Sequence, residues 1–98
     1  MSKLTIVANI HAKPDQVDLV KAELMKLIAT TRAEEGCLRY ELWRETENNS
    51  RMTIIEVWNS QSDLDRHLAQ PWFAEWGPKM EAAQATPLKV RVMSAVGE

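Results

Sequence analysis

Apolar and polar residues alternate at the start of the chain, between Lys3 and His11. A period of two places successive side chains on opposite faces of an extended strand. One face of this predicted strand carries Leu4, Ile6, Ala8 and Ile10, and the other carries Thr5, Val7, Asn9 and His11. The chain therefore opens with a predicted strand over residues 3–11.

The apolar period changes to that of a helix after Pro14. Proline suits the first helical position, and the carboxylate of Asp15 suits the positive N-terminal turn. Gly36 lies just past the expected end of this helix, where a residue able to adopt positive φ is favoured. The apolar stripe comprises Val17, Val20, Leu24, Leu27, Ile28 and Thr31.

Two further alternating segments, 37–44 and 51–58, flank a polar stretch at 45–50 that predicts a hairpin loop. We expect these two strands to pair antiparallel. On the first of them, one face is predicted to carry Leu38, Tyr40 and Leu42, and the other Arg39, Glu41 and Trp43.

A strand that ends at Trp58 leads directly into a second helix. Ser60 and Asp63 form an S-x-x-D capping box, which satisfies free N–H groups at a helix start. Leu64, His67 and Leu68 then share one helical face at i, i+3, i+4 spacing.

The second helix is predicted to break near Pro71, because proline lacks an N–H and restricts the residue before it. A further helical piece follows, and the Gly77-Pro78 pair predicts a kink within it. Its apolar stripe comprises Trp72, Phe73, Trp76 and Met80, and a last alternating strand is predicted over residues 88–96.

This order of elements predicts an α+β fold of the ferredoxin-like βαββαβ type, in which an antiparallel sheet carries its helices on one face. The other face is left uncovered, although several strands carry apolar or aromatic side chains on both sides. An exposed apolar sheet face of this kind calls for a partner.

Composition narrows the class of protein. Ninety-eight residues suit a single domain, 1–98, and a formal net charge of −2 gives no basic footprint for nucleic acid. The lone Cys37 forms no internal disulfide, and no membrane span or signal peptide is recognisable. We therefore expect a cytoplasmic protein without nucleic-acid or membrane partners. No phosphate-binding glycine loop or metal motif occurs, so neither cofactor nor metal is expected.

His67 is the one histidine on an apolar helical face, and its side chain can exchange a proton near neutral pH. It could serve as a general base, or be a structural histidine bonded to a sheet carbonyl or to Glu56. Trp58 could donate its indole N–H to a ligand oxygen or be core. Asn9 is unusual on a strand and marks either a ligand contact or a bulge or rim. Glu56 shares the face of Trp58 and either pairs with His67 or an arginine, or accepts a proton.

Three segments together resemble the antibiotic biosynthesis monooxygenase (ABM) family, and most closely its small quinol monooxygenase-like bacterial members. They are Glu-Gly-Cys-Leu-Arg-Tyr-Glu-Leu at 35–42, Glu-Val-Trp-x-Ser at 56–60 with Leu64 and His67, and Pro-x-Phe at 71–73. The resemblance implies a dimeric α/β barrel, in which two sheets pack face to face as a homodimer.

The resemblance also implies where chemistry lies. Cofactor-free members that oxidise phenols use a first-strand asparagine, matched by Asn9, and the tryptophan that ends the third strand, matched by Trp58. Some also use an asparagine where this chain has Ile54, which is a departure from the polyketide-type site. Heme-degrading relatives need a histidine near the position of Gly77, and no histidine follows His67, so heme is not expected.

The resulting hypothesis is a cofactor-independent monooxygenase that oxidises a hydroquinone or phenol to a quinone with O2. The predicted catalytic residues are His67 as base and Asn9 and Trp58 as oxygen donors. The predicted substrate-binding residues are Glu56, Ile54, Tyr40, Trp72, Phe73 and Trp76. Two alternatives stay open. One is a non-catalytic or stress-related metabolite-binding barrel, and the other is an isomerase of a phosphorylated sugar-like signal molecule, which would need a cationic anchor such as Arg39, Arg44, Arg51 or Arg91.

Overall fold

The computed structural model describes residues 3–97, which form one four-stranded antiparallel sheet with three helices. The strands are β1 (Leu4–His11), β2 (Cys37–Glu45), β3 (Asn48–Trp58) and β4 (Lys89–Met93), and the helices are α1 (Val17–Thr31), α2 (Gln61–Leu68) and α3 (Trp72–Ala82). The strand order is β2-β3-β1-β4. This is the predicted ferredoxin-like α+β arrangement.

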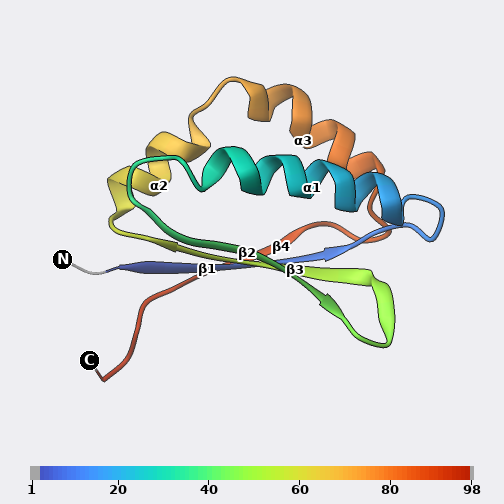
Figure 1. The fold of residues 1–98 in the computed structure, drawn as a ribbon, viewed down its shortest axis with the longest axis horizontal. Helices are drawn as coiled ribbons and strands as arrows, with labels where there is room; N and C mark the ends of the chain where they lie inside the picture. The colour runs from blue at the N-terminus through green and yellow to red at the C-terminus, as the bar shows by residue number, and fades with distance from the viewer. Residues whose placement is uncertain (1–2, 98) are drawn as a thin grey trace.

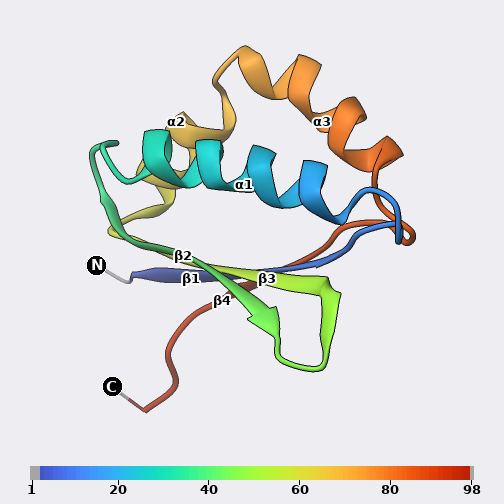
Figure 2. The ribbon, with the colours of Figure 1, turned by 45° about the vertical axis from the view of Figure 1, so that its right-hand side comes forward.

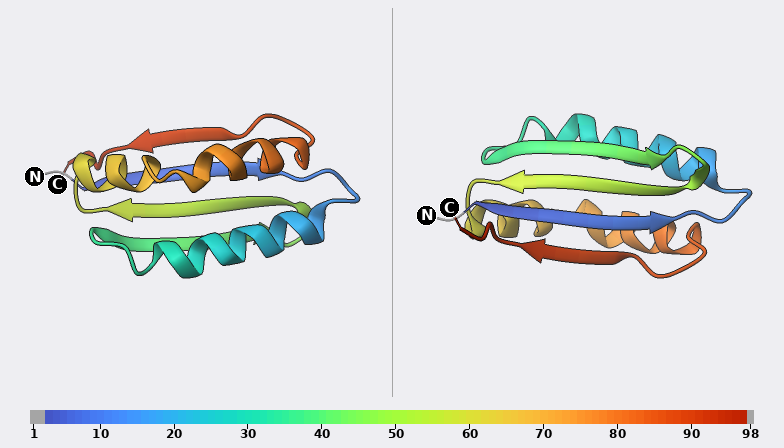
Figure 3. Two further views of the ribbon diagram at one scale, coloured as in Figure 1. Left: turned by 90° about the horizontal axis from the view of Figure 1, so that it is seen from above. Right: turned by 90° about the horizontal axis from the view of Figure 1, so that it is seen from below.

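All three helices lie on one side of the sheet (Figure 1). The same two layers, helices over strands, are visible after a 45° turn (Figure 2). Seen from below, the four strands face the viewer and the helices lie behind them (Figure 3). The predicted placement of both crossovers on one sheet face is therefore confirmed.

The alternation in β1 and β3 sets which side chains enter the core. Ile6, Ala8 and Ile10 share one face, as predicted, and the structure shows that this face is buried beneath the helices, while the residues between them are partly exposed on the opposite face. In β3 the buried positions are Met52, Ile54, Glu56 and Trp58. The register pairs Ile6 with Glu56 and Ala8 with Ile54, so these rows share one face.

Helix α1 begins at Val17, about one turn later than the Pro14 start that the sequence favoured, because residues 14–16 form a turn. Its predicted stripe faces the sheet. Gly36 has the expected positive φ of +83°, and a Cβ there would clash with the Asp63 side chain. Glycine is therefore required at this close approach between the chain after α1 and the start of α2.

Helix α2 begins and ends near the residues that the sequence predicted. Ser60 is the N-cap of α2 and its hydroxyl accepts a hydrogen bond from the Asp63 N–H. The break at Pro71 separates α2 from α3, as predicted. Helix α3 continues through Gly77 and Pro78 to Ala82. None of the helices in residues 3–97 is long and apolar enough to cross a bilayer.

Two local predictions in this part of the chain are wrong. Leu38 does not share the face of Tyr40, because a register shift between Cys37 and Arg39 leaves Leu38 unpaired and half exposed. The hairpin loop is shorter than 45–50, since β3 already begins at Asn48. Leu64, His67 and Leu68 do share one helical face, as predicted, because all three line the same cavity, although Leu68 is more than half exposed.

The sheet face away from the helices bears Val7, Ile55 and Val57, each partly buried, and the exposed Trp43. The register places the last strand, β4, beside β1, where all of its residues are exposed. Strand β4 ends at Met93, before the predicted Val96. An apolar, uncovered sheet face remains the basis for the homodimer prediction.

Candidate active site

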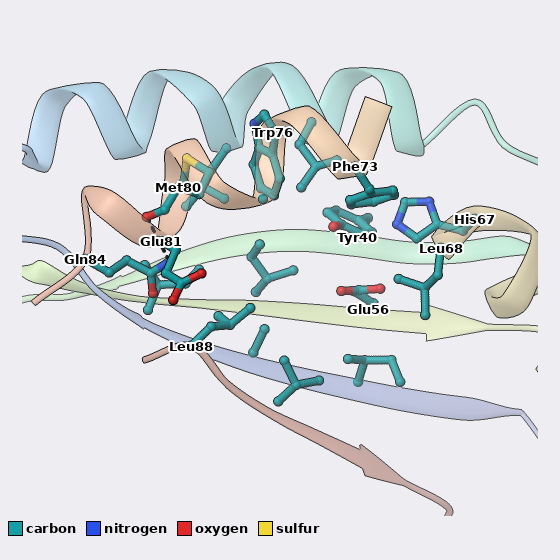
Figure 4. Close-up of a pocket in the computed structure, with 18 of the residues that line it drawn as sticks. Tyr40, Glu56, His67, Leu68, Phe73, Trp76, Met80, Glu81, Gln84 and Leu88 are labelled. Atoms are coloured by element: carbon teal, nitrogen blue, oxygen red, sulfur yellow. Dashed lines mark hydrogen bonds between the residues drawn. The ribbon is translucent and has the colours of Figure 1, made fainter. Parts of the chain in front are cut away.

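A cavity of about 600 Å³ lies between the sheet and helices α1 and α3. We call it the central cavity (Figure 4). Its lining is mostly apolar. The sheet contributes Ile6, Ala8, Ile10, Tyr40, Ile54, Glu56, Val90 and Val92, and the helices and following loop contribute Leu24, Leu27, Leu64, His67, Leu68, Phe73, Trp76, Gly77, Pro78, Met80, Glu81, Gln84, Pro87 and Leu88.

Polar side chains gather at one end of the cavity. Figure 4 shows His67, Tyr40 and Glu56 near one another at this end, with Met80, Gln84 and Leu88 toward the other. The helix α2 positions His67, whose side chain is only 2 % exposed. Its ring centroid lies 5.0 Å from that of Phe73, nearly perpendicular to it, and 4.8 Å from that of Trp58. The aromatic rings therefore fix the imidazole on several sides.

A carboxylate holds the histidine ring in place. His67 Nδ1 lies 3.0 Å from Oε1 and 3.1 Å from Oε2 of Glu34. Gln70 donates a hydrogen bond of 3.0 Å to Glu34 Oε2, and accepts one of 3.1 Å from the Trp72 indole. An anionic acceptor beside Nδ1 favours the tautomer in which Nδ1 carries the proton. His67 Nε2 makes no hydrogen bond to any residue between 3 and 97, and is then the basic nitrogen.

Glu56 is a second proton-holding group on the cavity wall. Its Oε1 accepts a hydrogen bond of 2.8 Å from the Trp58 indole N–H. Burial raises the pKa of Glu56, while the Trp58 N–H, the His67 ring and the Tyr40 hydroxyl oppose that shift by favouring the carboxylate. Burial also raises the pKa of Tyr40 well above its ordinary range, so its phenol stays neutral.

The structure brings together six of the nine residues singled out in the sequence. These line the central cavity: His67, Glu56, Tyr40, Ile54, Phe73 and Trp76. Ile54 occupies the place where some relatives carry asparagine, so this wall offers only aliphatic surface.

The other three residues lie elsewhere. Trp58 is fully buried, does not line the cavity and already uses its N–H on Glu56, so the expected direct donation to a ligand oxygen does not fit. Trp72 lines a separate groove between α1 and α3. Asn9 lies on the opposite sheet face, because its register partner is Thr53, whose hydroxyl donates to Asn9 Oδ1 at 3.0 Å. Asn9 and Trp58 therefore do not share a pocket within one chain.

Sequence reasoning missed Glu34. It lies in the turn after α1, a region with no periodic signal, and reaches His67 across 33 positions. Its only local signal was its place just before Gly36, the glycine that lets this turn approach α2. The expected pairing of His67 with Glu56 or a sheet carbonyl is replaced by the bond to Glu34.

Among residues 3–97, no arginine or lysine lines the central cavity; the charged lining residues are Glu56 and Glu81, besides the titratable His67. The strand arginines that an anionic ligand would require, Arg39, Arg44, Arg51 and Arg91, lie off its walls. Within residues 3–97 no group of three or more His, Cys, Asp or Glu side chains is arranged to hold a metal ion.

Comparison with known proteins identifies the family of this chain. Residues 3–79 match the family described as Antibiotic biosynthesis monooxygenase. The chain belongs to this family. A crystal structure described as an antibiotic biosynthesis monooxygenase is 31 % identical, with a TM-score of 0.86, and the match covers 95 % of this chain and 98 % of that one.

Two relatives match most of the chain. The Mycobacterium tuberculosis protein named "Putative monooxygenase Rv0793" is 27 % identical over 99 % of this chain and 95 % of its own length, and its solved structure gives a TM-score of 0.90. An uncharacterised Synechocystis protein is 32 % identical over 91 % of this chain. The match spans only 60 % of the Synechocystis protein.

Proposed function

We propose that this protein is a cofactor-independent monooxygenase that converts an electron-rich phenol or hydroquinone into a quinone with O2. The observation that carries the proposal is the Glu34–His67 pair at the polar end of an apolar cavity. A general base must reach the proton that it abstracts, and His67 lines the cavity with Nε2 unbonded.

The reaction begins with transfer of the phenolic proton to His67 Nε2. Glu34 acts as a positioning residue, because its carboxylate holds the ring orientation and stabilises the imidazolium that forms. The phenolate then passes one electron to O2, which gives a phenoxyl radical and superoxide. Removal of the proton is the decisive step, since triplet O2 reacts slowly with neutral closed-shell phenols.

The radical pair combines when a ring carbon forms a bond to oxygen, and the resulting peroxide takes a proton. The O–O bond then breaks as the ring carbon loses its hydrogen, which releases water and leaves a carbonyl. For a phenol, one O2 is consumed and one quinone and one water are formed; for a hydroquinone, the same steps give one hydroxyquinone and one water. Glu56 and neutral Tyr40 stand beside His67 to hold or return protons at the oxygen atoms.

The apolar walls serve the same chemistry. A low-dielectric cavity strengthens the hydrogen bonds to the developing oxyanion and excludes water from the radical pair. The lining supports this reading more than it supports an isomerase of a phosphorylated molecule, because no cation on the cavity wall could bind a phosphate.

Oxygen uptake tests the proposal. An oxygen electrode should record consumption when protein is added to 1-naphthol or a hydroquinone, above the rate of autoxidation without protein. Matched uptake by heat-inactivated protein, across a panel of phenols and hydroquinones, would favour the non-catalytic metabolite-binding alternative.

A further inference from the structure

We infer that the substrate is an uncharged amphiphile: a phenolic head bound at the polar end of the central cavity, carrying a hydrocarbon tail that lies along the apolar floor. This deepens the proposed function and rests on it for the identity of the head. The inference follows from the size of the cavity, the sheet register beneath it and the charge of its lining.

The cavity is larger than a phenol needs. A cavity of about 150 Å³ accommodates benzene, whereas this one has about 600 Å³. A single ring at the polar end leaves most of that volume unfilled. Cavities of several hundred Å³ are those that enclose ligands of larger size.

The sheet register shows where the remaining volume lies. One row of the cavity floor runs across the sheet through Tyr40, Glu56, Ile6 and Val92, and it contains both polar floor residues. In the next row, the residues that line the cavity are all apolar: Ile54, Ala8 and Val90.

Ile10 continues the floor beyond Ala8. Ile10 lies four positions after Ile6 along the strand, which is about 14 Å at the rise of an extended chain. The roof above this path is also apolar, since it includes Leu24, Leu27 and Met80. A tail that leaves the head therefore meets aliphatic surface on both sides over about two rows of the sheet.

The residues along this path and at its far end define its shape. Ala8 is the smallest side chain on the floor and lies in the middle row, so it leaves the space that a tail would occupy. Leu88, Val90 and Val92 are about half exposed and extend the apolar lining at the edge strand β4. Glu81 and Gln84 lie at the far end, beside the exposed end of α3.

The charge of the lining restricts the ligand. Its carboxylates, Glu56 and Glu81, face no lysine or arginine in the cavity. A phosphate or carboxylate on the ligand would lose its hydration without gaining a counter-charge, which is costly. The ligand is therefore uncharged before the head loses its proton.

Binding of 4-alkylphenols with methyl to octyl tails, measured by tryptophan fluorescence without O2 and below micelle-forming concentrations, tests the inference. The Kd should fall about threefold to fourfold for each added methylene until the path is filled. n-Octyl phosphate should bind at least tenfold more weakly than 4-octylphenol. A Kd independent of tail length, or equal binding of both octyl compounds, would overturn the inference.

Ala8→Leu should fill the middle row, weaken 4-octylphenol about tenfold and leave 4-methylphenol within about twofold. Ala74→Leu, the same change on the exposed surface of α3, is the matched control. If Ala8→Leu does not fold, Val90→Asp serves instead, because Val90 is half exposed and can accept a polar side chain. The introduced carboxylate would weaken binding of the tail and leave binding of the head unchanged. If Val90 instead contacts a second copy of the chain, Val90→Asp should dissociate the dimer. The dependence of Kd on tail length would then stay unchanged, which would contradict the inference.

The outcomes separate the two proposals. Tail-dependent binding without oxygen uptake would overturn the oxygenase and keep the ligand class. Oxygen uptake with no tail dependence would overturn the ligand class alone.

Discussion

The imidazole Nδ1 of His67 lies 3.0 Å from the carboxylate of Glu34, a residue 33 positions earlier in the chain. One residue comes from helix α2 and the other from the turn after α1, so only the folded sheet and its helices bring them together. This pair gives the cavity an oriented base.

Glu34→Gln should lower kcat about tenfold to hundredfold with little change in KM, because an amide no longer stabilises the imidazolium or selects its tautomer. Steady-state oxygen uptake measures both parameters. Glu35→Gln is the matched control, since Glu35 contributes only its backbone carbonyl, to Arg66. Equal losses in both variants would show that charge near this turn, and not the bond to His67, matters.

His67→Ala should lower kcat roughly a hundredfold near neutral pH, as expected when a general base is lost. The deficit should shrink as the pH approaches the pKa of the phenol, about 10, because solution then supplies the anion. A pH–rate profile of wild type and variant measures this. A deficit that stays constant across the profile would assign His67 a packing role, consistent with its contacts to Phe73 and Trp58.

Glu56 predicts a pH dependence of stability. Burial raises its pKa in the folded state above the ordinary 4.5, so the folded protein binds this proton more tightly than the unfolded chain does. The contribution of Glu56 to the unfolding free energy therefore falls as the pH rises from about 4.5 through the folded pKa. Urea unfolding of wild type and Glu56→Gln across this range should show the variant gaining relative stability with pH. Parallel curves for the two proteins would contradict a raised pKa of Glu56 in the folded state.

Trp58→Phe should act through Glu56. Loss of the indole N–H removes a hydrogen bond that favours the carboxylate, so the pKa of Glu56 should rise further. The Glu56-dependent part of the stability profile should then extend to higher pH, as urea unfolding would show. An unchanged profile would mean that this hydrogen bond does not influence Glu56.

The uncovered sheet face predicts a homodimer. Ile55→Asp, on the partly exposed face away from the helices, should shift sedimentation from dimer to monomer at micromolar concentration. Met25→Asp, on the exposed side of α1, is the control and should leave the assembly unchanged. A monomeric wild type would remove the prediction.

The sequence was sufficient to predict the order of elements, because caps and periodicity act locally. As predicted, Ser60 caps α2, Pro71 lies at the break between α2 and α3, and Gly36 adopts positive φ. The register between strands is not local. Alternation divided β1 correctly into two faces, but only the pairing of Asn9 with Thr53 shows that Asn9 lies away from the cavity.

The site was predictable to the extent that its residues occupy regular elements. His67 and Tyr40 follow from helical and strand periods, whereas Glu34 lies in a turn with no period. The indole of Trp58 could have served a ligand or the core; the nearby Glu56 carboxylate decides its hydrogen bond. Leu38 was misplaced because a bulge changes the parity of β2.

The origin of the new oxygen atom in the product tests the central claim most directly. The protein should convert 1-naphthol under ¹⁸O2 into 1,4-naphthoquinone that carries one ¹⁸O atom, measured by mass spectrometry and corrected for autoxidation and carbonyl exchange with water. His67→Ala should reduce this labelled product to near the uncatalysed level at neutral pH. Quinone formed at the rate seen without protein, or enzyme-dependent quinone whose new oxygen comes from water, would contradict the account.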